Sequence, residues 1–345
     1  MRRTASLRPA LLAVLAVAAL AAPPVASAQT ETVGRITGEL TLATAGAELD
    51  ATALAVDLIV LEAADVTGTV DATVDGTSFA VEVPLDAERR YVPRVRYQGV
   101  QYFGQPVSVT HDAPEVVAEL PPLYEATAEA PDLVVTETVV TAVALDRGTG
   151  QLGLIRDDFV TNPSDRVYVG GENGVTLRLP TPEGTLDASG ENADGEFDLA
   201  DGVLQAAVPL RALGGTSIVT RYVVAYDLAE DEYVLRVTTP LPADRLVVRV
   251  PEAYVHDLEL LGDGREGERD VIEVSDGEPV PLRTFVLEDA APGDSLIVRL
   301  DGLALRRNSN PLAETPGNLI AGAIALAVVG AAGAFAVVRT RGAGS

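Results

Sequence analysis

The chain has 345 residues, enough for two or three domains, and it contains neither Cys nor Lys. Without Cys, disulfides cannot hold the fold and a lipid-modified cysteine cannot anchor it, so an apolar core must supply the stability. The chain has 25 basic and 51 acidic residues, and its net charge of −26 repels nucleic acid and anionic lipid headgroups. This charge favours basic partners and divalent cations, although solvation alone is its simplest explanation.

The first 28 residues have the three parts of a secretory signal peptide. Three Arg residues precede an apolar run over residues 10–22, and the small residues Ala26 and Ala28 form a cleavage site. The run is short for a membrane span, so cleavage is favoured over an uncleaved anchor. We therefore expect residues 1–28 to be removed on export.

The middle of the chain has the period-two pattern of β-strands. Over residues 66–74, Val, Gly and Ala at even positions alternate with Thr and Asp at odd ones. Asp75 and Gly76 then supply a turn, and a second alternation over residues 79–83 predicts a hairpin with one buried face. The same pattern recurs at residues 175–179, 222–228, 233–237 and 296–300. The sequence thus predicts an all-β protein of tandem β-sandwiches.

Proline-rich segments divide this β region. Residues 121–131 are rich in Pro and small polar residues and are predicted to link a first module, 29–120, to a second β-sandwich region, 132–306. A weaker sub-boundary falls near Pro251. Residues 307–318 are predicted to form a stalk.

The first module resembles a known family. The opening Gly-Arg-Ile-Thr-Gly at residues 34–38, the turn at residues 73–79 and the Tyr-rich strand at residues 91–102 carry the likeness. Residues 33–120 thereby resemble the carboxypeptidase regulatory-like (transthyretin-like) β-sandwich of bacterial envelope proteins. The resemblance implies a non-catalytic accessory or binding module, sometimes linked with carbohydrate, and it transfers no catalytic residue. The later part resembles a second sandwich of the sort found beside such modules.

A C-terminal membrane helix is predicted over residues 319–338. These 20 residues carry no charge and, at about 1.5 Å per residue, span roughly 30 Å, the thickness of a hydrocarbon core. Arg339 and Arg341 in the tail, residues 339–345, predict a cytoplasmic C-terminus and an N-terminus outside. The predicted location is therefore the cell membrane, with a single pass.

An alternative fate for this end is covalent attachment to a cell wall. Residues 312–317 read Leu-Ala-Glu-Thr-Pro-Gly and resemble the Leu-Ala-x-Thr-Gly sorting signal of some high-GC Gram-positive bacteria. Pro316 separates Thr315 from Gly317, where the family pattern has no residue, and it changes the bond to be cut. We therefore favour the helix itself as the anchor.

One acidic loop is a candidate calcium site. Its oxygen-bearing residues are Asn192, Asp194, Glu196, Asp198 and Asp201. Oxygen ligands at alternate positions with intervening glycines suit Ca²⁺, although the spacing differs from that of an EF-hand. A solvated acidic loop is the simpler interpretation, so Ca²⁺ is the only cofactor that we consider.

Aromatic residues near one turn are a candidate glycan platform. Tyr97, Tyr102 and Phe103 cluster around Gly99 and would have to present ring faces to a sugar. Aromatic residues at strand ends usually belong to the core, and the core is the favoured interpretation.

No catalytic residue is predicted. His111 and His256 are each followed by Asp, but adjacent residues of a strand point to opposite faces, and no Gly-x-Ser-x-Gly motif is present. Two distant His without Cys do not make a zinc site. The sequence therefore predicts a non-catalytic, membrane-anchored extracytoplasmic module that contacts envelope proteins or glycans. The alternatives are a carbohydrate-binding accessory protein and a hydrolase with an unrecognised carboxylate site.

Overall fold

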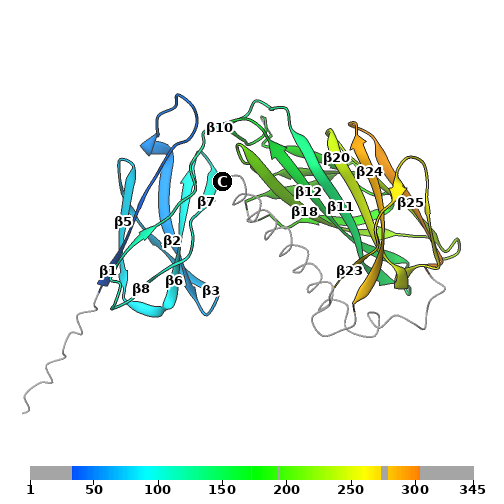
Figure 1. Ribbon diagram of the computed structural model, residues 1–345, viewed down its shortest axis with the longest axis horizontal. Coiled ribbons are helices and arrows are strands. Elements are labelled where there is room, and N and C mark those ends of the chain that lie inside the picture. The colour runs from blue at the N-terminus through cyan, green and yellow to red at the C-terminus, as the bar shows by residue number, and fades with distance from the viewer. Residues whose placement is uncertain (1–32, 172, 193, 273–278, 304–345) are drawn as a thin grey trace, which may run out of the picture.

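A computed structural model describes residues 33–171, 173–192, 194–272 and 279–303 (Figure 1). This part of the chain is all-β, as predicted, apart from the two short 3₁₀ turns η1 (Ala51–Ala53) and η2 (Glu252–Tyr254). Within it, no helix is long and apolar enough to cross a membrane. The predicted signal peptide, stalk, membrane helix and tail lie outside the described residues, and so do residues 29–32 and 304–306.

The first sandwich consists of two sheets that face each other. The β1 sheet has the order β4-β5-β1-β9, and its strands are β1 (Val33–Glu39), β4 (Thr73–Asp75), β5 (Ser78–Pro84) and β9 (Glu115–Ala118). The β2 sheet has the order β3-β2-β6-β7 with β8 beside β6, and its strands are β2 (Leu54–Glu62), β3 (Asp65–Asp71), β6 (Asp86–Tyr97), β7 (Val100–Phe103) and β8 (Val107–Val109). All pairings are antiparallel except that of β9 with β1.

The alternation at residues 66–83 is only partly a hairpin. Strands β4 and β5 do pair through the turn at Asp75–Gly76, and Phe79, Val81 and Val83 are buried, as predicted. The preceding residues, however, belong to β3 in the other sheet, because the chain changes sheets at Ala72, whose N–H donates to Val56 O. The expectation that the apolar stripe of residues 66–74 is buried holds only in part: Val66 is 68% exposed, whereas Val70, Ala72 and Val74 are half-buried against the first core.

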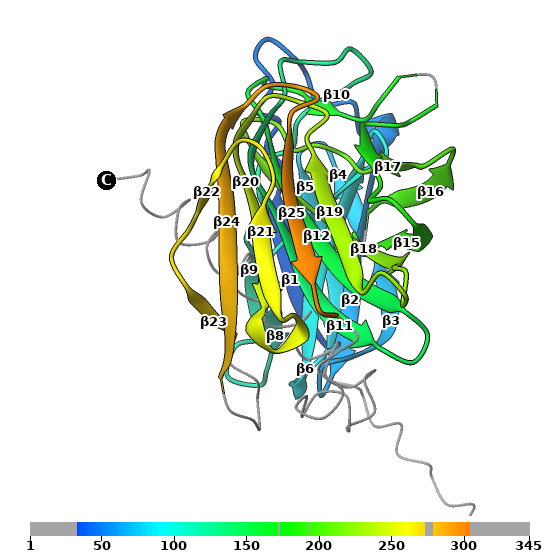
Figure 2. The same ribbon diagram turned by 90° about the vertical axis from the view of Figure 1, so that its right-hand side faces the viewer.

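The second sandwich places one large sheet against two small ones. The β12 sheet has the order β15-β18-β12-β11-β20-β24-β22 with β23 beside β24, and it faces the β17 sheet (β14-β17-β16) and the β25 sheet (β19-β25-β21), the latter in front in Figure 2. The strands of the large sheet are β11 (Val134–Asp146), β12 (Gln151–Asn162), β15 (Thr185–Gly190), β18 (Gly214–Ala225), β20 (Ala243–Pro251), β22 (Arg265–Glu266), β23 (Asp270–Ile272) and β24 (Val280–Ala290). The small sheets contain β14 (Leu177–Pro180), β16 (Glu196–Ala200), β17 (Val203–Ala207), β19 (Glu232–Thr238), β21 (Asp257–Leu260) and β25 (Ser295–Asp301).

One apolar core runs through the second sandwich. It extends from Leu133 to Leu303 and includes Val250 and Tyr254, on either side of Pro251. Residues from both sides of the proposed sub-boundary therefore pack into the same core. Strand alternation explains the core, since every second residue of the long strands faces inward.

The segment 121–131 is ordered and makes tertiary contacts. Leu123 is fully buried in the first core, its N–H donates to Thr41 O, and its own C=O accepts from Ala43 N. Strand β10 (Ala126–Thr127) then pairs in parallel with β13 (Val167–Tyr168) of the second sandwich. In Figure 1, β10 lies at the end where the two sandwiches meet.

Candidate functional site

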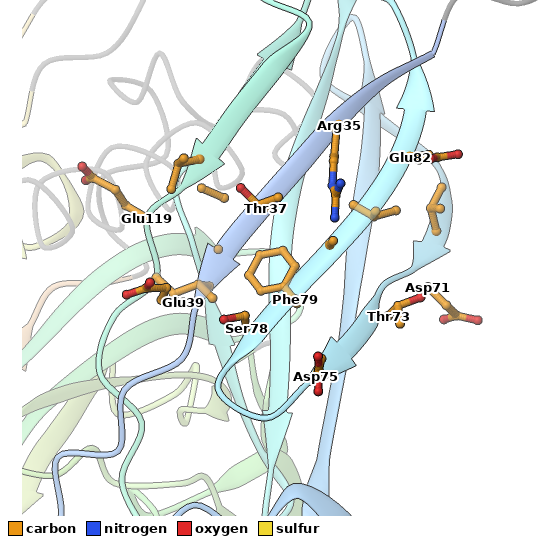
Figure 3. A pocket seen from close by; sticks show the side chains of 17 residues that line it. Arg35, Thr37, Glu39, Asp71, Thr73, Asp75, Ser78, Phe79, Glu82 and Glu119 are labelled. Carbon is orange, nitrogen blue, oxygen red and sulfur yellow. The ribbon is translucent and has the colours of Figure 1, made fainter.

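A hollow of about 1150 Å³ lies on the outer face of the β1 sheet. Its lining comes from β1, β4, β5 and β9 and from the end of β3 (Figure 3). Strand alternation builds it: Ile36, Phe79 and Val81 turn into the core, which leaves Arg35, Thr37 and their neighbours on the outside.

The absence of a side chain at Gly38 shapes the floor beneath this hollow. Gly38 lies directly opposite Phe79 in the register of β1 and β5. A Cβ at position 38 would come within 2.3 Å of the Phe79 ring, so only glycine lets the ring pack there. The core beneath the hollow is thereby filled by an aromatic ring.

Short side chains form a row across the middle of the hollow. Thr73 pairs with Ala80, Ala80 pairs with Thr37, and Thr37 pairs with Val117, so the row crosses all four strands. Val117 is 71% exposed. We call this row the trough.

Charged residues line both sides of the trough (Figure 3). On one side lie the carboxylates of Asp75, Glu39 and Glu119, which we call the acidic bank. Asp75 and Glu39 both pair with Ser78 in the strand register, and Glu119 follows the end of β9. On the other side lies the mixed bank, formed by Asp71, Glu82 and Arg35, the last two being directly opposite in the register.

None of these six charges joins an ion pair within 4.0 Å in the part of the chain that the structure describes. Among the described residues, moreover, no three acidic or His side chains converge closely enough to hold a metal ion. The hollow is therefore a broad, acidic surface without a point of convergence.

The five calcium-candidate residues are spread over three elements. Asn192 serves the fold, since its side chain donates to Ser217 O at 2.7 Å and accepts from Val219 N at 3.2 Å. Asp194 pairs with Arg211 at 2.9 Å. Glu196 and Asp198 are exposed on β16, and Asp201 sits in the following turn with φ of 52°. In this conformation the five oxygen-bearing side chains do not surround a common point.

The glycan-candidate aromatic residues do not form a platform. Tyr97 and Tyr102 are 0% and 4% exposed and belong to the first core, whereas Phe103 is 40% exposed. The alternation of β6 and β7 turns both tyrosines inward and Phe103 outward. Two of the three rings thus lie in the core, which is the interpretation that the sequence favours.

Tyr102 instead belongs to the junction between the sandwiches. Its hydroxyl donates to Tyr124 O and accepts from Tyr124 N, each at 3.1 Å, and the Arg211 guanidinium lies 5.0 Å from its ring centroid. Val167 and Ala212 of the second sandwich complete the first core. The sequence did not reveal this junction, because no local pattern links Tyr102 to residues a hundred positions away.

Electrostatics at the junction centre on Asp194. Burial raises the pKa of Asp194, whereas the nearby Arg211 and, to a lesser extent, Arg94 lower it. Arg94 is itself held by two hydrogen bonds to the buried Asp57, of 2.8 and 2.7 Å. Additional polar contacts cross the junction from Thr44 to Asp165 O and from Arg166 to Glu125.

A second buried charge pair lies inside the large sandwich. Arg156 and Asp158 are 2% and 0% exposed and join through hydrogen bonds of 2.7 and 2.9 Å, and the Thr138 hydroxyl donates to Asp158 at 2.6 Å. The network is enclosed by the core, so its role is structural. The two histidines, His111 and His256, are exposed and belong to different sandwiches.

Comparisons with known proteins identify no family. No family model matches the chain, and none of the curated proteins does. Among solved structures, a putative protease from Parabacteroides distasonis matches at 10% identity with a TM-score of 0.26, over 49% of this chain and 40% of that one. The T6 backbone pilin of Streptococcus pyogenes serotype M6, described as modular with three domains, matches at 8% identity with a TM-score of 0.17, over 77% of this chain and 76% of the pilin. The chain thus spans less than half of the first of these proteins, and neither likeness is strong enough to indicate function.

Proposed function

We propose that the protein is a non-catalytic, membrane-anchored module that mediates contacts in a bacterial cell envelope, outside the cytoplasm. Its first sandwich would be of the carboxypeptidase regulatory-like type, on the resemblance of residues 34–38 and 73–79. Export would use residues 1–28, and residues 319–338 would span the membrane.

The observation that carries the proposal is the joined packing of the two sandwiches. Leu123, Val167 and Ala212 share the first core, and β10 and β13 continue the contact as a small parallel sheet. Such packing fixes the direction in which each sheet face points, because a buried junction resists bending where an exposed linker would not. Two sandwiches that are packed firmly against each other, and held beside a membrane, suit a protein that presents fixed surfaces to partners.

The anchored topology can be tested by fractionating cells that express the full chain. We expect the protein in the membrane pellet, resistant to alkaline carbonate and released by detergent. Protease added to intact spheroplasts should remove the sandwiches, because they would lie outside. A chain truncated after Asn318 should be released in soluble form.

A matched pair of substitutions makes the test specific to the apolar segment. Leu326→Arg places a charge in the middle of the predicted span, where insertion is costly, and should move the protein to the soluble fraction. Ala343→Arg adds the same charge to the tail and should leave the distribution unchanged. Recovery of the unaltered full chain in the cytosol would contradict the proposal.

A further inference from the structure

We propose that the trough on the β1 sheet binds an extended polypeptide segment that carries Arg or Lys side chains. This deepens the proposed function, on which it rests, by giving the contact a place and the partner a chemistry. The contact would be made by the trough and by the carboxylates of its two banks.

Charge complementarity is the first argument. Glu39, Asp75 and Glu119 on the acidic bank, with Asp71 and Glu82 on the mixed bank, surround the trough together with one positive charge, Arg35. None of them is neutralised by an ion pair within the described residues. Unpaired carboxylates around one hollow add their fields and attract a cationic partner.

The spacing of these carboxylates favours a polymer over a small ion. No three acidic side chains converge on one point in the described part of the chain, so a single metal ion would not satisfy them. Four strands at about 4.8 Å spacing make the trough roughly 14 Å long, which matches about four residues of extended chain. A segment with several basic side chains can reach both banks from this line.

The trough floor suits such an occupant. Thr37, Thr73 and Ala80 are short, so a backbone or the aliphatic stem of Arg or Lys has room above them. Val117 is 71% exposed at the β9 end and offers an apolar surface for such a stem. Shape and charge therefore favour the same ligand.

Binding can be measured with the full chain in detergent and a fluorescein-labelled peptide of alternating Arg and Ala, by fluorescence anisotropy. Neutralising the acidic bank with Glu39→Gln, Asp75→Asn and Glu119→Gln should weaken binding about tenfold or more, as expected for the loss of several exposed ion pairs. The salt dependence of binding should become shallower, because fewer charges remain to be screened.

The matched control removes the same net charge from the second sandwich. Asp187→Asn, Glu230→Gln and Asp244→Asn change three exposed carboxylates that join no ion pair of the described residues. This control should alter the affinity by less than about twofold, since its sites lie on β15, in the turn before β19 and on β20. Equal losses in both triple variants would show that only net charge matters and would overturn the proposal.

A second pair of variants keeps the test independent of carboxylate removal. Val117→Arg places a competing cation at the trough, whereas Val66→Arg makes the same change at a similarly exposed position, 68% against 71%, on β3. Only Val117→Arg should weaken peptide binding. Equal binding of a Glu-Ala peptide, or binding that occurs only with added Ca²⁺, would also overturn the proposal. Because this assay needs no cells, its failure is distinct from a failure of membrane anchorage.

Discussion

The guanidinium of Arg211 lies over the ring of Tyr102, 5.0 Å from its centroid, and thereby joins the two sandwiches. The same guanidinium pairs with Asp194, whose side chain is only 15% exposed. One residue thus satisfies an aromatic face from the first sandwich and a half-buried carboxylate from the second.

Arg211→Ala should destabilise the protein by about 2 kcal/mol, because it removes the cation–π contact and leaves Asp194 without its partner. Tyrosine fluorescence during urea unfolding can measure this, since the chain has nine Tyr and no Trp. We expect the first sandwich to unfold at lower urea in the variant. Arg178→Ala, an exposed arginine on β14, is the control and should change stability by less than about 0.5 kcal/mol.

Removing one member of the buried Arg156–Asp158 pair should cost much more stability than removing the whole polar network. Asp158→Ala leaves Arg156 charged and enclosed, which should cost about 3–5 kcal/mol. The triple replacement Thr138→Val, Arg156→Met and Asp158→Leu removes all three polar side chains of the network together and should recover most of that loss. Chemical denaturation of both variants measures the difference, and a triple variant no more stable than Asp158→Ala would contradict the explanation.

Asp157 should make stability depend on pH in mildly acidic solution. Burial raises the pKa of Asp157 to about 6 from 3.8, with Asp158 and Glu137 adding to the rise and a hydrogen bond from Ser217 opposing it. The folded state then holds a proton that the unfolded state loses. Stability should therefore fall as pH rises from about 4 to 6 and remain lower above that range.

Replacing Asp157 by Asn removes this penalty. Above pH 6 the variant should be more stable than the parent, by up to about 3 kcal/mol, and below pH 4 the difference should vanish. Thermal unfolding across this pH range measures it. Asp187→Asn alters an exposed carboxylate on β15 and should show no such gain.

Substitution by alanine should have very different effects on stability at Gly38 and at Gly68, two glycines of the first sandwich. Gly38→Ala would press a Cβ against the Phe79 ring at 2.3 Å and should cost at least about 1–3 kcal/mol through overpacking. At Gly68 on β3, nothing lies within 4 Å of the added Cβ, so Gly68→Ala should be neutral or slightly stabilising. Equal effects of the two substitutions, measured by urea unfolding, would contradict this packing of Phe79.

The sequence predicted which side chains of a strand face inward better than it predicted where a strand bulges or the chain changes sheets. Alternation correctly assigned Phe79 and Val81 to a buried face, because period two follows directly from strand geometry. The same rule placed Val66 in the core, and it is exposed, because the register of β2 and β3 shifts between Val60 and Leu61, and alternation does not show where such a bulge falls. Nor does it show that the chain changes sheets at Ala72, where the N–H donates to the distant Val56 O.

The candidate site was less predictable still. The trough depends on the cross-strand register of Thr73, Ala80, Thr37 and Val117, and register between separated strands is a tertiary property. The three aromatic residues were correctly placed near one turn, yet their side chains alternate between the core and solvent. Sequence patterns therefore identified the β-sandwich but not the residues that line the proposed binding surface.

The parallel pairing of β9 with β1 sets the order in which the first sandwich can be completed. Strand β1 pairs first with β5 and must wait for residues 115–118 before its other edge is covered. A chain that emerges N-terminus first therefore exposes one edge of β1 until nearly the whole module has been delivered. Pairing across such a sequence separation is slow, so during that interval β1 is the part of the nascent module most open to pairing with another chain.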